Sequence, residues 1–125
     1  LVGECHIRFV YYHVTMLSST NLSVTDSIIH LIGITAHHHI PATGEEKIIV
    51  DMDLAILGAD EKRFVEYEQQ IRKEYSFVPD TIFQTKRTEI LQGFLNRPRI
   101  YGTAYFFDRL ESRARCNLRT LGTPA

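Results

Sequence analysis

Apolar side chains recur at steps of three and four positions along the second half of this chain, and this spacing limits the fold more than any other feature. The stripe after residue 60 consists of Phe64, Tyr67, Ile71 and Tyr75. Side chains at such steps lie on one face of an α-helix. Two later stripes have the same period: Phe83, Ile90, Leu91, Phe94 and Leu95 in one, and Phe107, Leu110, Ala114 and Leu118 in the other. The sequence therefore predicts an all-α fold.

Capping residues and prolines set the expected ends of the helices. Asp60 and Thr103 are residue types that favour the N-cap position. Pro41 stops an earlier apolar helix, and Pro98 stops a later one, because proline cannot continue a helix. We expect a loop over residues 41–47. The predicted helices cover residues 24–39, 51–58, 61–76, 80–97 and 104–119.

Composition and charge narrow the class of protein. The chain has 125 residues, 44% hydrophobic and 23% charged, which is typical of one soluble globular domain or of part of one. Its formal net charge of −1 gives no overall attraction to nucleic acid or to an anionic membrane. We interpret the arginines at 97–99 and 109–119 as solvated faces, and the two cysteines fit a reducing compartment. We therefore expect a cytoplasmic protein without a nucleic-acid or membrane partner.

The segment 51–58, with the sequence Asp-Met-Asp-Leu-Ala-Ile-Leu-Gly, contains the most informative polar residues. Asp51 is a natural N-cap and Gly58 a natural helix stop. Asp53 would then share a face with Ile56 and Leu57, which lie three and four residues later. An unpaired carboxylate on a packed face is costly, so Asp53 needs a partner. That partner is either an arginine or a metal ion.

Three consecutive histidines, at 37–39, precede this segment. Consecutive side chains on a helix point about 100° apart, so at most one or two of them reach a single ion. The histidines would also suit a solvated helix end, where they favour the helix dipole. Because Asp53 follows after a loop, one metal ligand from this turn is a reasonable prediction.

Two charged residues interrupt the apolar stripes. Arg87 lies between Phe83 and Ile90, and Glu111 lies between Phe107 and Ala114. Both are therefore predicted to be buried, near one another or near a shared partner. One interpretation is a buried ion pair that holds the bundle together. The other is that Arg87, together with Arg72, lines a phosphate pocket.

Over residues 24–118, about three quarters of its length, the chain resembles a family of predicted metal-dependent phosphohydrolases of the HD superfamily. Five spaced blocks in the same order carry the resemblance. They are residues 29–35 with His38, residues 51–59, Tyr67 with residues 71–75, Arg87 with Ile90, Leu91, Phe94, Leu95, Arg97, Ile100 and Tyr101, and Glu111 with Ala114, Arg115, Asn117 and Leu118.

The resemblance implies an HD-like helical bundle that binds one or two divalent metal ions. HD enzymes bind their metal through a histidine, an adjacent His-Asp pair and a distant aspartate, and the distant aspartate corresponds to Asp53. The resemblance therefore implies Asp53 and His38 as metal-site residues. Arg72 and Arg87 would bind a small phosphorylated molecule, either a phosphate ester or a nucleotide.

The chain departs from the family in one respect, because it contains no His-Asp dipeptide. Residues 1–22 do not resemble the family, so we expect an atypical segment there, an HD-like domain at 23–121 and a tail at 122–125. A metal-dependent phosphohydrolase that is inactive as this chain alone is one interpretation. The alternative is a non-catalytic helical module, derived from the HD fold, that binds a partner or forms a homo-oligomer.

Overall fold

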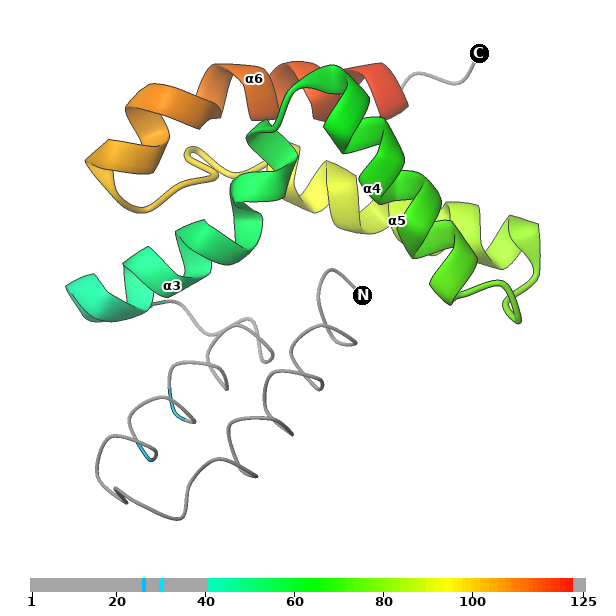
Figure 1. Ribbon diagram of the computed structural model, residues 1–125, viewed down its shortest axis with the longest axis horizontal. Helices are drawn as coiled ribbons and strands as arrows, with labels where there is room; N and C mark the ends of the chain where they lie inside the picture. Colours follow the sequence, from blue (N-terminus) through cyan, green and yellow to red (C-terminus); the bar gives the residue numbers. More distant parts are fainter. Residues whose placement is uncertain (1–25, 27–29, 31–40, 123–125) are drawn as a thin grey trace. The chain divides into compact units, whose positions relative to one another are not determined.

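The computed structural model describes Asp26, His30 and residues 41–122 (Figure 1). Every regular element among these residues is helical, so the predicted all-α class is confirmed for the described part of the chain. The described residues fall into two compact units, divided between Asp53 and Leu54. The elements are α3 at Gly44–Leu54, the short 3₁₀ helix η1 at Ala55–Gly58, α4 at Glu61–Glu74, α5 at Asp80–Leu95 and α6 at Ala104–Gly122.

Helices α4, α5 and α6 begin at the predicted residues, and their C-terminal ends differ from the prediction by two or three residues. The predicted caps are also confirmed. The Asp60 carboxylate accepts a hydrogen bond from the backbone N–H of Arg63 at 3.0 Å. The Thr103 hydroxyl accepts one from the backbone N–H of Phe106 at 3.4 Å. Each cap satisfies an N–H group that the first turn of a helix leaves without a partner.

The start of α3 differs from the prediction. The expected loop over residues 41–47 is confirmed for 41–43 and wrong for 44–47, because the helix begins at Gly44. Thr43 and Glu46 form a capping box, in which the Glu46 N–H donates to the Thr43 hydroxyl at 3.2 Å and the Thr43 N–H donates to the Glu46 carboxylate at 3.3 Å. The Thr-x-x-Glu spacing is a known signal for a helix start, and it outweighs the nearby proline and glycine.

Little of the predicted helix over residues 24–39 lies within the described residues. Asp26 and His30 are both helical, and the remainder falls outside. His30 Nε2 lies 3.4 Å from a carboxylate oxygen of Glu46. The backbone N–H groups of Ala42 and Thr43 lower the pKa of Glu46, and His30 lowers it further. The backbone N–H groups of the capping box therefore favour the ionised form of Glu46.

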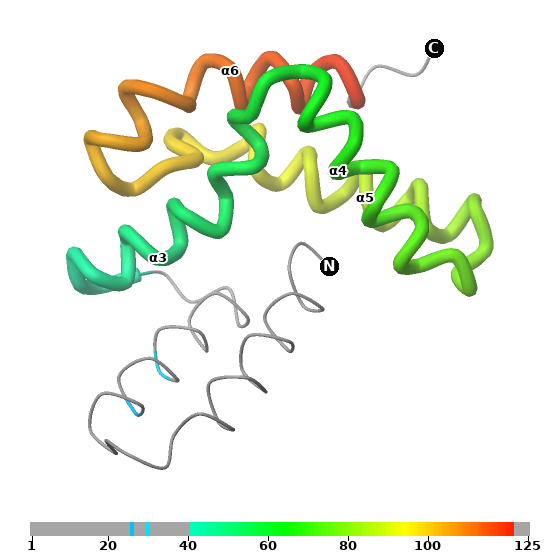
Figure 2. The backbone as a smooth tube through the Cα atoms, in the orientation of Figure 1, coloured from blue at the N-terminus to red at the C-terminus, as the bar shows by residue number. Residues whose placement is uncertain are grey.

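The second unit has a compact core, to which η1 and all three long helices contribute. Its buried apolar residues are Leu54, Leu57, Phe64, Ile71, Leu91, Phe94, Ile100, Tyr101, Ala114 and Leu118. Helix η1 packs against α6 and α4, and Figure 2 follows the chain through this short turn. Within the described ranges, no helix combines the length and the apolar character that crossing a membrane requires.

Candidate functional site

The acidic segment does not lie in the predicted register. Because α3 begins at Gly44, Asp51 falls in the third turn, and the prediction that it caps the helix is wrong. Asp51 is 1% exposed, whereas Asp53 is half-buried. The α-helix gives way to the 3₁₀ helix after Leu54, so a four-residue step such as that from Asp53 to Leu57 no longer keeps to one face. Asp51, not Asp53, is the inward carboxylate of this helix.

Two buried side chains donate hydrogen bonds to the backbone just after Asp53. The Tyr101 hydroxyl donates a hydrogen bond to the carbonyl of Leu54 at 2.9 Å. The Asn117 amide donates to the carbonyls of Leu57 and Ala59 at 2.8 and 2.9 Å. The last carbonyls of a helix have no partner within it. Tyr101 and Asn117 therefore bind three backbone carbonyls between Leu54 and Ala59.

Gly58 allows this turn to lie close to α6. A Cβ atom at this position would come within 2.7 Å of the Leu110 Cβ and 3.0 Å of the Tyr101 hydroxyl oxygen. The backbone of Gly58 is not left-handed, so the glycine does not act as the usual helix stop. The prediction that the helical segment ends at Gly58 is confirmed, but the physical reason is close packing.

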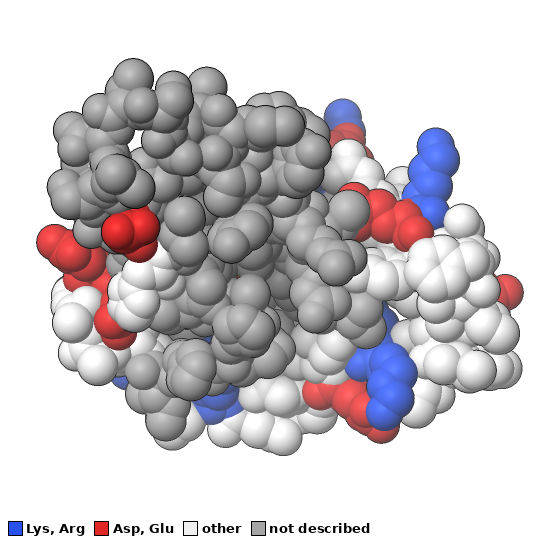
Figure 3. Space-filling view, turned by 90° about the horizontal axis from the view of Figure 1, so that it is seen from below, with Lys and Arg blue, Asp and Glu red and all other residues white. Residues whose placement is uncertain are grey.

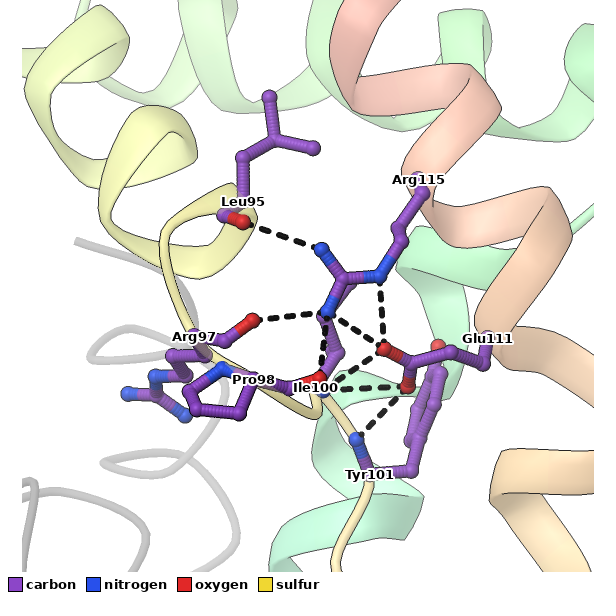
Figure 4. Close-up of polar contacts among 7 residues, drawn as sticks. All are labelled: Leu95, Arg97, Pro98, Ile100, Tyr101, Glu111 and Arg115. Carbon is purple, nitrogen blue, oxygen red and sulfur yellow. Dashed lines mark hydrogen bonds and ion pairs between the residues drawn. The ribbon is translucent and has the colours of Figure 1, made fainter.

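Glu111 holds the loop between α5 and α6 through backbone groups (Figure 4). It is 6% exposed, and its carboxylate accepts hydrogen bonds from the N–H groups of Ile100 at 3.0 and 3.1 Å and of Tyr101 at 3.2 Å. Arg115, one turn later in α6, donates to the same carboxylate at 2.8 Å. Burial of Glu111 is therefore matched by both a cation and two N–H donors.

Arg115 completes this arrangement from the other side of the loop. Its guanidinium donates to the carbonyls of Leu95 at 3.0 Å, Arg97 at 2.8 Å and Pro98 at 3.1 Å. These carbonyls lie at and after the end of α5, where helical partners run out. We call Glu111 and Arg115 the loop clamp, because together they bind the backbone on both sides of the turn.

Arg87 forms a separate buried ion pair. It is 5% exposed, and it donates to both carboxylate oxygens of Glu68 on α4, through Nε at 3.0 Å and through Nη2. Burial alone would lower the pKa of Arg87, but the Glu68 carboxylate and, less strongly, Tyr67 outweigh it and raise that pKa. The predicted burial of Arg87 and Glu111 is confirmed, whereas the predicted shared partner is wrong, because each has its own.

Arg87 keeps one nitrogen without a partner. Its Nη1 is buried and has no hydrogen-bond acceptor among the described residues. The Tyr67 ring lies beside the guanidinium, with its centroid 5.9 Å from the guanidinium carbon. Such an orphaned donor on a permanently charged group is uncommon in a protein interior.

The guanidinium of Arg72 forms its hydrogen bonds within the turn that follows α4. Its guanidinium donates to the carbonyls of Tyr75 at 2.8 Å and Val78 at 3.1 Å, and it also pairs with the Asp80 carboxylate. It lies over the Phe83 ring, 4.7 Å from the centroid. These contacts hold the α4–α5 turn together. Arg72 and Arg87 therefore belong to separate polar clusters, and no contact joins them into the predicted phosphate pocket.

The predicted metal residues are only partly described. Asp53 lies in α3, while His38 and its neighbours lie outside the described residues. Among the residues that are described, no three His, Cys, Asp or Glu side chains gather as a metal-binding group. A catalytic metal site needs about three protein ligands. Of the two predicted metal residues, Asp53 is the one that the structure describes.

Sequence reasoning missed the roles of Tyr101, Asn117 and Arg115. Arg115 carries a local signal, since it lies four residues after Glu111 and such pairs face each other on a helix. Tyr101 and Asn117 carry no local signal, because their acceptors lie 47 and 60 positions away. No protein-family model, curated protein or solved structure matches this chain.

Proposed function

We propose that this chain is part of a metal-dependent phosphohydrolase of the HD type, acting on a small phosphate ester or nucleotide. Asp53 would contribute one ligand to a divalent metal ion, with His38 near it. The observation that supports this proposal is the convergence of the blocks that carry the family resemblance. Tyr101 and Asn117, which lie in two later blocks, donate hydrogen bonds to the carbonyls of Leu54, Leu57 and Ala59, in the block that contains Asp53.

This convergence has a physical rationale. A functional carboxylate acts well only when neighbouring residues fix its backbone and limit its movement. The hydrogen bond from Tyr101 fixes the carbonyl of Leu54, the residue after Asp53. Asp53 is half-buried, so an ion from solution can reach it, whereas Asp51 is almost sealed. A bound divalent ion would activate water for attack on a phosphate ester.

The arginines contribute unequally to this proposal. Arg72 has its guanidinium committed to two carbonyls and a carboxylate of its own turn. Arg87 retains the N–H groups of Nη1, from which a phosphate oxygen could accept hydrogen bonds only if the buried guanidinium became accessible. The commitment of Arg72 favours the second candidate function, a non-catalytic helical module that binds a partner or a second copy of the chain.

Metal titration of the 125-residue chain tests the proposal first. We expect manganese, zinc or magnesium to bind weakly or not at all in calorimetry, since about three protein ligands are needed and the His-Asp pair is missing. A longer protein that contains these residues together with a His-Asp pair should bind the ion tightly. It should also hydrolyse a general phosphatase substrate such as p-nitrophenyl phosphate.

The decisive variant is Asp53→Asn in such a longer protein, with Asp60→Asn as the matched control. Both remove one carboxylate charge, and asparagine replaces aspartate well at the Asp60 N-cap. We expect Asp53→Asn to abolish metal-dependent hydrolysis and Asp60→Asn to retain it. Full activity in Asp53→Asn would disprove the proposed role of Asp53. Tight binding by the 125-residue chain that depends on Asp53 would show that its own histidines complete the site.

A further inference from the structure

The net charge of −1 conceals a strong separation of charge along the chain. Residues 97–125 contain six arginines, no lysine and two acids, a net charge of +4, whereas residues 1–96 carry −5. A near-zero total therefore does not describe the field around the C-terminal helix. Local charge, rather than the total, determines which partner a surface attracts.

Most of these arginines are exposed and have no carboxylate partner. Arg115 belongs to the loop clamp, but Arg97, Arg99, Arg109 and Arg113 form no ion pair within the described part of the chain. The α4–α5 pair differs, since four of its six cations pair with carboxylates, as Lys86 does with Glu89 at 3.0 Å. Figure 3 shows such neighbouring positive and negative side chains on the described surface.

The outer face of α6 arranges the exposed groups in a row. Tyr105, Arg109 and Arg113 follow one another at steps of four, which corresponds to about 6 Å of rise per step. All three are exposed, and Asp108 is the exposed acid of this helix. The buried side chains of α6, including Glu111 and Ala114, lie on the opposite face. We call Tyr105, Arg109 and Arg113 the outer row.

The chemistry of these side chains suits phosphate groups and flat rings. Arg109 lies over the Tyr105 ring at 3.8 Å from the centroid, and Arg99 lies over the Phe107 ring at 4.0 Å. A ring beneath a guanidinium limits its rotation and leaves N–H groups at its edge for bidentate contact with phosphate. Tyr105 is 58% exposed, so part of its side chain remains available for stacking.

We propose that the outer row binds single-stranded nucleic acid. Arg109 and Arg113 contact successive phosphates, and Tyr105 stacks on a base. Exposed aromatic rings within a positive surface are the usual platform for single strands. An acidic protein would not need the ring, and a lipid surface would need more exposed apolar side chains than Tyr105 and Leu121, the two large ones on α6. This inference does not depend on the proposed phosphohydrolase function.

Fluorescence anisotropy with a labelled single-stranded RNA tests the proposal on the 125-residue protein. The test variant is Arg109→Gln/Arg113→Gln, and the matched control is Lys62→Gln/Arg63→Gln on the exposed face of α4. Both remove two positive charges from a helix surface. Circular dichroism confirms that the helices remain. We expect the control to bind as the unmodified protein does and the α6 variant to bind at least tenfold more weakly.

The salt dependence identifies the contacts. Loss of two phosphate contacts should reduce the slope of log affinity against log salt by about 1.4, since each contact to a single strand contributes about 0.7. Tyr105→Ala should weaken binding at least fivefold without changing that slope, because stacking releases no counterions.

Three results would overturn the proposal. One is the absence of salt-dependent RNA binding by the unmodified protein. Another is an equal loss in the α4 control, which would reduce the effect to net charge. The third is equal competition by polyglutamate or by vesicles of anionic lipid, which would assign the outer row to an acidic protein or to a membrane surface.

Discussion

The α4–α5 pair and the α6 region use their charged side chains in opposite ways. In α4 and α5, cations and carboxylates neutralise one another, both in the buried pair of Arg87 with Glu68 and in the exposed pair of Lys86 with Glu89. In α6, the buried charges of Glu111 and Arg115 hold the backbone of an irregular loop. The exposed Arg109 and Arg113 of α6 have no carboxylate partner among the described residues.

This difference teaches what each set of charges contributes. An ion pair between two helices can be replaced by apolar side chains of similar size, because no other group depends on it. A charged side chain that forms hydrogen bonds with buried backbone N–H and C=O groups cannot be replaced in this way. Those backbone groups remain polar after the substitution and lose their partners. The loop clamp should therefore matter more for stability than the Arg87–Glu68 pair, although both are buried.

The largest expected effect is the loss of the Glu111 carboxylate. Glu111→Ala leaves the N–H groups of Ile100 and Tyr101 without acceptors and leaves Arg115 without its counter-charge. We expect the free energy of unfolding to fall by about 3–5 kcal/mol, as for other broken buried pairs. Chemical denaturation followed by circular dichroism measures it. The control Glu66→Ala, an exposed residue of α4, should change it by at most about 0.5 kcal/mol.

An equally small change in both variants would contradict the comparison between the two regions. It would mean that water replaces the carboxylate of Glu111 at the loop without cost. Amide hydrogen exchange at Ile100 and Tyr101 distinguishes this case, since a water-filled site exchanges quickly even when global stability is kept.

Much of the fold follows from sequence, because repeated local signals agree. The stripe of Phe64 and Ile71, the cap at Asp60 and Pro98 after α5 predict the same elements that the structure contains. The start of α3 was not predicted correctly, although the Thr43–Glu46 spacing is a signal for a helix start. The prediction starts this helix at the acid of position 51, whereas the helix begins at Gly44.

The second prediction separates the two buried pairs directly. Replacing both members with apolar residues, as in Arg87→Met/Glu68→Leu, should leave stability within about 1 kcal/mol of the original or raise it. The matching Glu111→Leu/Arg115→Met should lower stability by at least about 2 kcal/mol, because two buried N–H groups lose acceptors at about 1–3 kcal/mol each. Urea denaturation of both double variants tests it. A similar cost in both would show that the Arg87 pair is not independent of the backbone.

The candidate site followed from sequence only in part, for a physical reason. Burial of Arg87 and Glu111 follows from their places in the apolar stripes, since position on a helix face is a local property. Their partners do not follow, because Glu68 and the N–H of Ile100 reach them only through the packing of separate elements. Several helices carry residues of opposite charge that could pair with each of these two, and the nearest such residue in sequence need not be the nearest in space.

The third prediction compares glycines from the two regions. Gly58→Ala places a Cβ atom 2.7 Å from the Leu110 Cβ of α6, so something must move. We expect a loss of about 1–3 kcal/mol, the usual cost of overpacking. Gly93→Ala, on the exposed face of α5, meets nothing within 4 Å and should stabilise the protein by about 0.5–1 kcal/mol, because alanine favours the helix. Thermal denaturation that showed equal effects would disprove the close packing of η1 against α6.

The smallest predicted effects have opposite signs in the two regions. Lys86→Gln breaks an exposed pair with Glu89 and should cost about 0.2–0.5 kcal/mol. Arg113→Gln removes a like-charge neighbour of Arg109, one turn earlier on α6, and should gain a similar amount of about 0.2–0.5 kcal/mol. Matched denaturation curves at low and high salt measure both, and added salt should shrink both differences because the groups are exposed. A loss of stability in Arg113→Gln would mean that an unrecognised carboxylate neutralises the outer row, and the inferred attraction for nucleic acid would then lose its basis.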